Sequence, residues 1–454
     1  MTEMPEKVNI TKKRTAGAVV KECLMCACIV LVLIEMDRCL ENLYPYMWFD
    51  SGKRIIDLWM AFEMRTHALL VWAIPAGFVV WLVMKLAVKK EKPELGILLP
   101  AVGLYLVILL ISLAVDGNIS RWANSTRYPL VMLLFLTMQC STVSGAKRLV
   151  RVATDTYIAL LAVNLVFIAF PVLYEIITGW TVDYFIGQYN LVGFPMATGM
   201  LYALLDSRIN GRSVREADSV VVPSPKGGDR LKSQRGFPVR LWIYAVLFFV
   251  NLYLIGCATN LIMGAVVAVF LLVPFLRKAA EKWNFWAFTG FTLAMFAALM
   301  WFLVPVMSLK PMEWLATTVL KQDVTLSRRQ IMWDDVIKLV YEKPLLGHGL
   351  GDKPYIWQDP TWTHEYLMHA HNCWLQTLYE GGLVYFSAVL VVFGFIASNI
   401  KKLKDRKAAG MTVTMLFALL ILQEANIEAW FVWFPVLMFA QLGILVSRRC
   451  GELN

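Results

Sequence analysis

The residues best suited to chemistry lie in one stretch of the sequence, from residue 329 to residue 385. This stretch is the longest polar interval of the chain, and it holds four of the five histidines: His348, His364, His369 and His371. A histidine with an unperturbed pKa of about 6.5 can accept a proton at neutral pH. The planar guanidinium of Arg329, at the start of the stretch, is suited to binding phosphate oxygens. We therefore expect the chemistry of the protein here.

The chain around this stretch has the composition of a membrane protein. Its 454 residues are 59% hydrophobic and only 17% charged, which is too apolar for a soluble globular protein. The net charge of +10 does not indicate a nucleic-acid partner, because the charges lie in short loops between apolar runs. Membrane lipids are the expected surroundings, and no cofactor motif is present.

Apolar runs long enough to cross a hydrocarbon layer of about 30 Å as a helix occur about twelve times. The predicted spans are residues 18–36, 67–88, 95–115, 128–142, 152–178, 188–207, 240–258, 261–277, 284–307, 373–397, 410–424 and 429–447. The prediction is an all-α polytopic membrane protein with about 12 transmembrane helices. Its parts would be residues 1–307 with spans one to nine and a basic cytoplasmic linker at 208–239, an extracytoplasmic catalytic loop at 308–372, and residues 373–454 with the last three spans.

The distribution of Lys and Arg predicts the orientation. Every loop on one side of the predicted spans is basic, and that side holds most of the 43 Lys and Arg residues. Basic loops stay in the cytoplasm, so both termini are expected there and the 308–372 loop outside.

The loop sequence predicts a helix, a turn and a second helix. Apolar residues at helical spacing follow Arg329, Trp333 lies one turn on, and the run ends at Pro344. The sequence PLLGHGLGD predicts a tight turn, because glycine permits positive φ and close backbone approach. Residues 369–372, His-Ala-His-Asn, then lead into the tenth span.

A polar stripe descends from that point into the membrane. Asn372, Gln376 and Glu380 recur every four residues, so they share one face of the predicted helix. Polar groups in lipid are costly unless they face a protein interior or a cavity. The stripe is therefore expected to line a site.

These motifs resemble those of the O-antigen ligase and O-antigen polymerase superfamily of bacterial membrane glycosyltransferases. The resemblance rests on R-x-x-x-W, on PLLGHGLG, and on HN followed by G-x-x-Y: Arg329, Trp333, His371, Asn372, Gly382 and Tyr385. Residues 187–190, Gly-Gln-Tyr-Asn, are similar to the family's G-x-x-N signature. Outside residues 329–385 and this tetrapeptide, only the layout of spans and loop agrees.

The resemblance implies an enzyme of the bacterial plasma (inner) membrane. Its donor would be a glycan linked to undecaprenyl diphosphate, and its acceptor a lipid A core, a growing polysaccharide or a protein. Such a transfer needs cations at the diphosphate and a base at the incoming hydroxyl. No DxD-like motif lies in the outer loops, which favours a metal-independent reaction.

Roles follow for individual residues of this sequence. His371 is the expected base and Arg329 the expected catalytic cation. The expected substrate-binding residues are Arg328, Trp333, His369, Asn372, Gln376, Glu380 and Asn190.

The sequence departs from the family in two places. Tyr385 stands where members often have glycine, and Thr259-Asn260 stand where members usually have Ser-Arg at the start of the eighth span. We expect Arg328 and Arg329 to replace the missing cation, with Arg121 and Arg127 as the next candidates, and we expect an arginine at position 260 to be tolerated.

Structural interpretations compete with these roles. Arg329 could cap an interfacial helix or extend to the membrane surface, and His371 could be an ordinary residue of a helix start. Asn190 could be a helix cap, and His348 and Asp352 are expected to shape the glycine turn.

Two alternatives concern the whole stretch and the whole chain. The four histidines show no closed pattern of metal ligands, so no metal site is predicted. The rival function is a multi-span transporter or flippase of a polar or lipid-linked substrate. Transporters place ionisable residues near the bilayer midplane, whereas here they gather in an outer loop.

Overall fold

The computed structural model describes the greater part of the chain. The described residues are 16–36, 54–115, 119–173, 184–186, 191–218, 238–282, 285–307, 309–319, 329–350, 355–358, 365–423 and 433–453. The candidate residues Asn190 and Arg328 lie outside them, as do Asp352 and His364. Arg329 is described as the first residue of a helix, without its side chain.

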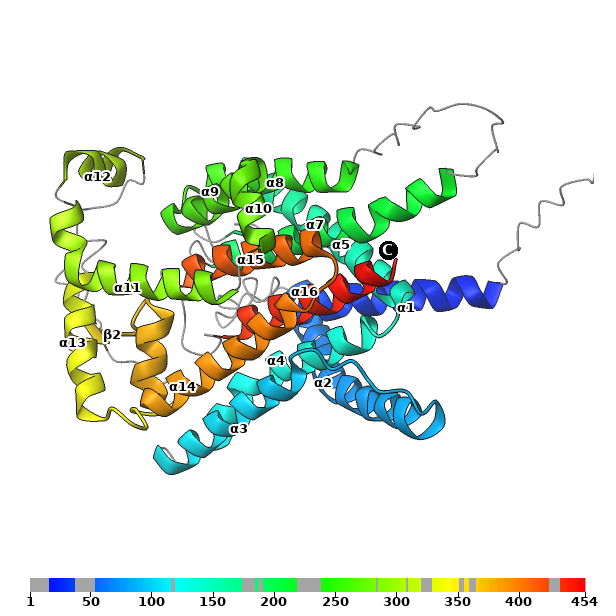
Figure 1. The fold of residues 1–454 in the computed structure, drawn as a ribbon, viewed down its shortest axis with the longest axis horizontal. Coiled ribbons are helices and arrows are strands. Elements are labelled where there is room, and N and C mark those ends of the chain that lie inside the picture. Colours follow the sequence, from blue (N-terminus) through cyan, green and yellow to red (C-terminus); the bar gives the residue numbers. More distant parts are fainter. Residues whose placement is uncertain are drawn as a thin grey trace, which may run out of the picture.

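The described chain is a bundle of helices (Figure 1). The helices that overlap the predicted spans are α1 (Ala16–Met36), α2 (Arg54–Val83), α3 (Leu98–Val115), α4 (Ile119–Gln139), α5 (Val143–Ala169), α7 (Gly193–Asp218), α8 (Val239–Ile255), α9 (Ala258–Leu272), α10 (Pro274–Lys282), α11 (Phe285–Met307), α14 (Cys373–Lys401), α15 (Arg406–Gln423) and α16 (Phe434–Glu452). The π-helix η2 (Met84–Val88) extends α2. Between α11 and α14 lie α12 (Lys310–Trp314), the π-helix η3 (Leu315–Val319), α13 (Arg329–Glu342) and the strands β1 (Tyr355–Gln358) and β2 (Glu365–Met368).

Five helices of the described part are long and apolar enough to cross a membrane. Their apolar segments are Gly17–Ile34, Arg65–Val88, Leu98–Val115, Val143–Ala169 and Cys373–Lys401. The pair α9 and α10 passes the same test as one bent unit. The protein is thus a multi-pass membrane protein, and the number of about twelve spans stays a prediction.

The prediction of one continuous span at 261–277 is wrong. The helices α9 and α10 meet at an angle of 90°. The cause is Pro274, because proline forces the preceding residue out of the helical region. Val273 accordingly has extended φ and ψ of −81° and 111°.

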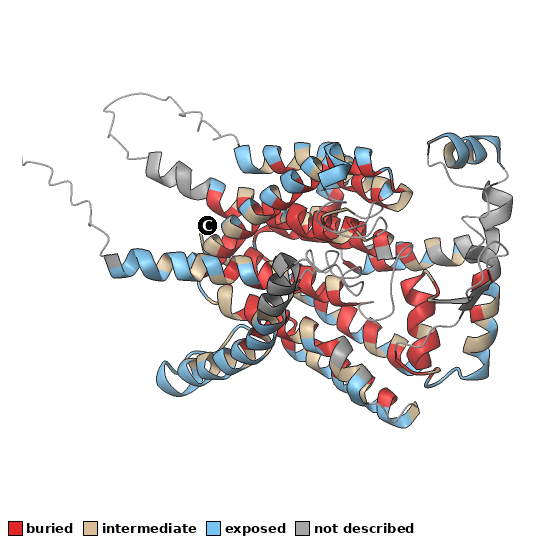
Figure 2. Ribbon diagram, turned by 180° about the vertical axis from the view of Figure 1, so that it is seen from behind, coloured by how far each residue is buried: buried red, intermediate tan, exposed pale blue. Residues whose placement is uncertain are grey.

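The core lies along the three helices α7, α15 and α16, which are buried over most of their length (Figure 2). The peripheral helices α2, α3 and α8 keep large apolar side chains exposed on their outer faces, among them Trp72, Leu110 and Trp242. An apolar outer surface of this extent matches a lipid environment.

Polar side chains join the helices inside the bundle. On α16, Gln441 donates from Nε2 to Leu95 O at 3.0 Å and to Thr137 Oγ1 at 2.6 Å, and its Oε1 accepts from Ile97 N at 2.9 Å. This one amide therefore attaches the segment before α3 to both α4 and α16.

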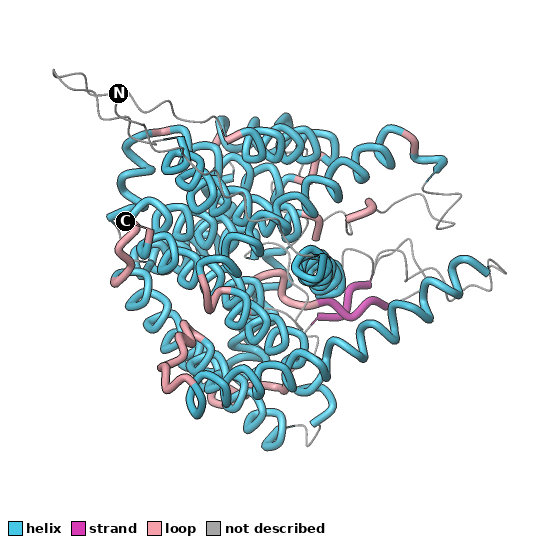
Figure 3. The backbone as a smooth tube through the Cα atoms, turned by 90° about the vertical axis from the view of Figure 1, so that its right-hand side faces the viewer, coloured by secondary structure: helices cyan, strands magenta, loops and turns pink. Residues whose placement is uncertain are grey.

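Within the described residues, the fold is all-α apart from one short hairpin between α11 and α14. Strands β1 and β2 pair antiparallel, with Tyr355 opposite Met368 and Gln358 opposite Glu365. The hairpin, magenta in Figure 3, lies beside α13. The sequence had not predicted it.

Candidate functional site

The helix α13 begins at Arg329, as predicted, and is fixed to the start of α14. Trp333 is buried, and its Nε1 donates to Ala370 O at 2.9 Å. A small apolar cluster surrounds this contact, formed by Met332, Trp333, Val336, Ala370, Leu375 and Tyr379. The predicted tryptophan therefore connects α13 to the histidine motif.

His369 and His371 are presented side by side by a constrained turn. Their ring centroids are 4.3 Å apart. His371 has φ of 47°, a left-handed conformation that is uncommon for a residue other than glycine. Between them, Ala370 is held on both sides, because its carbonyl accepts from Trp333 and its N donates to Gln376 Oε1 at 2.8 Å. Backbone strain of this kind gathers at functional sites.

Asn372 is the N-cap of α14. Its φ and ψ are extended, and its Oδ1 accepts from Trp374 N at 3.0 Å and from Leu375 N at 2.9 Å. These bonds satisfy two of the backbone donors at the helix start. The residue thus has a structural role in addition to the predicted substrate contact.

The predicted polar stripe forms a connected chain inside the protein. Gln376 and Glu380 are buried, and Gln376 Nε2 donates to Glu380 Oε1 at 3.0 Å. The orientation of the Gln376 amide follows from its neighbours, because the Ala370 N–H requires an acceptor and the carboxylate requires a donor. Glu380 is therefore linked through one side chain to the backbone of the histidine turn.

Helix α14 is broken at Gly382, ten residues below the cap. This residue has φ of 59° and ψ of −157°, a conformation accessible to glycine. The break exposes backbone groups that the turn at 344–349 satisfies. The four bonds run from His348 N to Tyr379 O (2.8 Å), from Gly349 N to Glu380 O (3.0 Å), from Leu383 N to Pro344 O (2.8 Å) and from Val384 N to Leu345 O (3.2 Å).

Two glycines allow the turn and the helix to approach this closely. A Cβ on Gly347 would lie 2.5 Å from Tyr379 O, and a Cβ on Gly382 would lie 2.4 Å from Leu345 O. Both distances are shorter than any real carbon contact. The glycine-rich turn predicted from the sequence is thus half of a joint whose other half is the glycine of α14.

His348 completes this joint with its side chain. The ring stacks on Tyr379 with centroids 4.6 Å apart and planes 10° apart. Its Nε2 lies 2.8 Å from Leu339 O, and since a carbonyl only accepts, this nitrogen is the protonated one. His348 therefore connects the end of α13 to α14, a contact that goes beyond the predicted role of shaping the glycine turn.

The two other candidate cations, Arg121 and Arg127, differ in what the structure describes. Arg127 is exposed on α4, where its guanidinium donates to Tyr128 Oη at 2.8 Å and lies 4.7 Å from that ring's centroid. Arg121 is placed on the same helix without its side chain. Neither residue is shown to approach the histidine turn.

Asn260, which replaces the family arginine, is fully buried near the start of α9. A Cβ on Gly193, three residues after the 187–190 tetrapeptide, would lie 2.3 Å from Asn260 Oδ1. The expectation that arginine is tolerated at position 260 stays a prediction, and Gly193 of α7 is where the longer side chain would first make contact.

Metal ligands do not gather within the described ranges. No group of three or more His, Cys, Asp or Glu side chains there is placed to hold a metal ion.

The fold and this site define a membrane protein in which α13, the glycine turn and the start of α14 form one connected, histidine-bearing unit. Residues 243–390 match the family model for O-antigen ligase. The matched segment includes α13, the glycine turn, the histidine turn and the break in α14. The resemblance to the O-antigen ligase and polymerase superfamily is confirmed, and the chain carries a domain of that family. No curated protein matches the chain.

Proposed function

We propose that the protein is a metal-independent membrane glycosyltransferase of the O-antigen ligase or polymerase type. It takes a glycan from undecaprenyl diphosphate and passes it to a lipid A core or a growing polysaccharide on the outer face of the plasma membrane. The observation that carries this proposal is the coincidence of the family match with a strained histidine turn held by Trp333 and Gln376.

The proposed reaction needs one residue to remove a proton and another to stabilise the leaving group. His371 takes the proton from the acceptor hydroxyl as its oxygen bonds to the anomeric carbon of the donor glycan. The bond between that carbon and the phosphate oxygen breaks, and undecaprenyl diphosphate leaves with the electron pair. Arg329, aided by Arg328, stabilises the charge of the leaving diphosphate.

Other residues of the site act on position and binding. Trp333, Asn372, Gln376 and Glu380 are buried, and they fix the histidine turn through the contacts given above, so they shape the substrate site from beneath it. His369 lies against His371 and contacts the acceptor. Asn190, which precedes α7 by three residues in the sequence, contributes a further substrate contact.

The proposal includes an orientation. The N- and C-termini are cytoplasmic, the 208–239 linker is cytoplasmic, and the 308–372 loop is the extracytoplasmic catalytic part. The lipid-linked donor then enters from the outer leaflet beside α14.

The first prediction tests the base. His371→Ala should abolish glycan transfer by the full-length protein in membranes containing lipid-linked donor, while insertion and yield stay normal. His364→Ala is the comparison, since that histidine should matter much less. Near-normal transfer by His371→Ala, or a reversed ranking of the two variants, would remove the proposed base.

Ligase and polymerase activities are separated by a gene deletion followed by gel analysis of surface glycans. Loss of all long chains from lipid A indicates ligation, and single-repeat caps indicate polymerisation. Substrate flux with an untouched lipid-linked glycan would instead indicate a transporter.

A further inference from the structure

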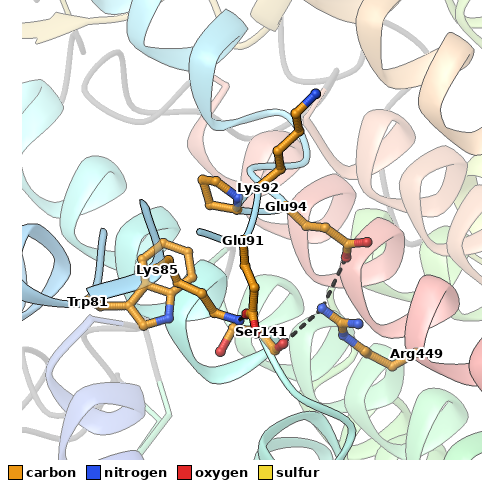
Figure 4. Close-up of a pocket in the computed structure, with 8 residues that line it drawn as sticks. Trp81, Lys85, Glu91, Lys92, Glu94, Ser141 and Arg449 are labelled. Carbon is orange, nitrogen blue, oxygen red and sulfur yellow. Dashed lines mark hydrogen bonds and ion pairs between the residues drawn. The ribbon is translucent and has the colours of Figure 1, made fainter. Parts of the chain in front are cut away.

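A charged cavity lies at the end of the bundle that is predicted to be cytoplasmic. Its volume is about 360 Å³ (Figure 4). Its walls come from the end of α2 with η2, from the segment before α3, from the turn after α4 and from the end of α16. The side chains that matter below are Trp81, Lys85, Glu91, Glu94, Ser141 and Arg449.

The walls of this cavity are fixed. Arg449 donates to the backbone carbonyls of Cys140 and Ser141, each at 2.9 Å. The segment before α3 is attached by Gln441, which a Cβ on Gly96 would contact at 2.3 Å. The cavity is therefore a built feature and not a gap between loosely placed loops.

The charged side chains differ in how far the protein encloses them. Lys85 pairs with Glu91, and Arg449 pairs with Glu94 at 3.1 Å. The cations are the more buried partners, with side-chain exposures of 20% for Lys85 and 12% for Arg449, against 51% for Glu91 and 40% for Glu94. The hydrogen bond and charge of Lys85 lower the pKa of Glu91, so this carboxylate is ionised at neutral pH.

The cavity opens beside an apolar surface. The last turns of α2 lean away from the bundle (Figure 1), and they expose Val79, Val80 and Val83. Trp81 lies one turn before Lys85, and tryptophan favours the boundary between acyl chains and headgroups. Along this segment, the side chains that line the cavity follow in the order Trp81, Lys85, Glu91, Lys92 and Glu94.

We propose that this cavity binds the headgroup of an aminophospholipid, a lipid with a phosphodiester and a primary ammonium. The phosphate lies nearer the acyl chains and meets Lys85 and Arg449, and the ammonium lies nearer water and meets Glu91 and Glu94. The acyl chains cover the exposed valines of α2.

Charge balance favours this zwitterionic headgroup over an anionic one. Lys85 and Arg449 face Glu91 and Glu94 in the cavity. Outside it, Arg449 also pairs with Glu452 and the ammonium of Lys92 extends away in Figure 4, so positive and negative charges balance. A headgroup with only negative charge would meet both carboxylates unfavourably. A quaternary ammonium has no N–H to donate to them, so phosphatidylcholine is the discriminating comparison.

The test uses the full-length protein purified from nanodiscs that contain equal amounts of phosphatidylethanolamine, phosphatidylcholine and phosphatidylglycerol. Native mass spectrometry then counts the lipids retained. Phosphatidylethanolamine should be retained about tenfold over phosphatidylcholine, a ratio that corresponds to ~1.4 kcal/mol. Equal retention, or a preference for phosphatidylglycerol, overturns the proposal.

Variants separate the two halves of the headgroup. Glu91→Gln with Glu94→Gln should abolish the preference over phosphatidylcholine, and Lys85→Ala should lower retention of both. Lys338→Ala removes the lysine of a similar exposed pair with Asp335 on α13 and should leave lipid retention unchanged.

A competition experiment separates a lipid headgroup from a soluble ligand. Soluble phosphoethanolamine should not displace the lipid, and displacement at equal concentration would assign the cavity to a free metabolite. The lipid comparison with the unmodified chain stands even where a variant fails to fold.

Discussion

At the scale of single residues, the side chains near the histidine motif divide into those that form the turn and those that connect it. Trp333, His371 and Asn372 could be predicted from spacing, because each belongs to a recognisable motif. The bond from His348 to Leu339 could not, since a backbone carbonyl leaves no trace in a sequence. The role of Arg329 also stays a prediction, because its side chain is outside the described part.

A prediction at this scale concerns His348. His348→Ala removes the bond to Leu339 O and the stacking on Tyr379, and should lower the free energy of unfolding by about 1–2 kcal/mol. Because His348 connects α13 to α14, we expect a lower kcat with little change in KM. His348→Gln, which keeps a donor, should recover part of the rate. A KM effect without a kcat effect would contradict a positioning role.

A second residue-scale prediction exchanges two partners. Gln376→Glu places two carboxylates together where an amide donated before, so activity at neutral pH should fall strongly. Adding Glu380→Gln restores the order, since the new carboxylate at position 376 can accept from Ala370 N and the new amide at position 380 can donate to that carboxylate. We expect the double variant to exceed Gln376→Glu alone in transfer assays. A double variant no better than the single one would show that the charge of Glu380 is itself required.

At the scale of elements, the joint between the 344–349 turn and α14 explains two glycine motifs at once. The turn was predicted from its glycines, and the tenth span from its apolar length. Their contact was not predicted, because a glycine inside an apolar helix is often tolerated without a break. A Gly-Gly pair in the span was the one signal available.

The element-scale prediction is a steric test of this joint. Gly382→Ala should destabilise the protein by about 1–3 kcal/mol or more and abolish transfer, because its φ is positive and the new carbon overlaps Leu345. Gly394→Ala in the same helix is the matched control, since its Cβ would meet only Trp286 at 3.4 Å. Thermal unfolding in detergent measures both. Equal melting temperatures would show that α14 can close its break.

At the scale of the whole molecule, the apolar runs predicted where helices form, and a described helix overlaps every predicted span. The bend between α9 and α10 was missed, although Pro274 is a sequence signal for it, because the spans were predicted from hydropathy alone. Contacts between helix ends that are distant in the sequence were also hidden. Arg208, after the core of α7, pairs with Asp405 before α15 at 2.9 Å.

This pair gives the last prediction. Asp405 is almost fully buried and also accepts from Ala408 N at 3.2 Å, so Asp405→Ala removes an ion pair and a helix cap together. We expect a loss of about 3–5 kcal/mol in unfolding free energy, as for other broken buried pairs. Asp405→Asn keeps the cap and should lose less. Denaturation in detergent compares the two variants, with Lys338→Ala as the surface control. An equal loss of unfolding free energy in that control would show that the buried pair contributes no special stability.

The joint at Gly382 also has a consequence for protein engineering. All four of its hydrogen bonds are between backbone atoms, so they specify chain path without specifying most side chains. Chimaeras that exchange this part of the chain with that of a related protein would therefore need to carry residues 344–384 as one cassette. A graft with a boundary between the turn and the glycine would bring together two halves shaped for different partners.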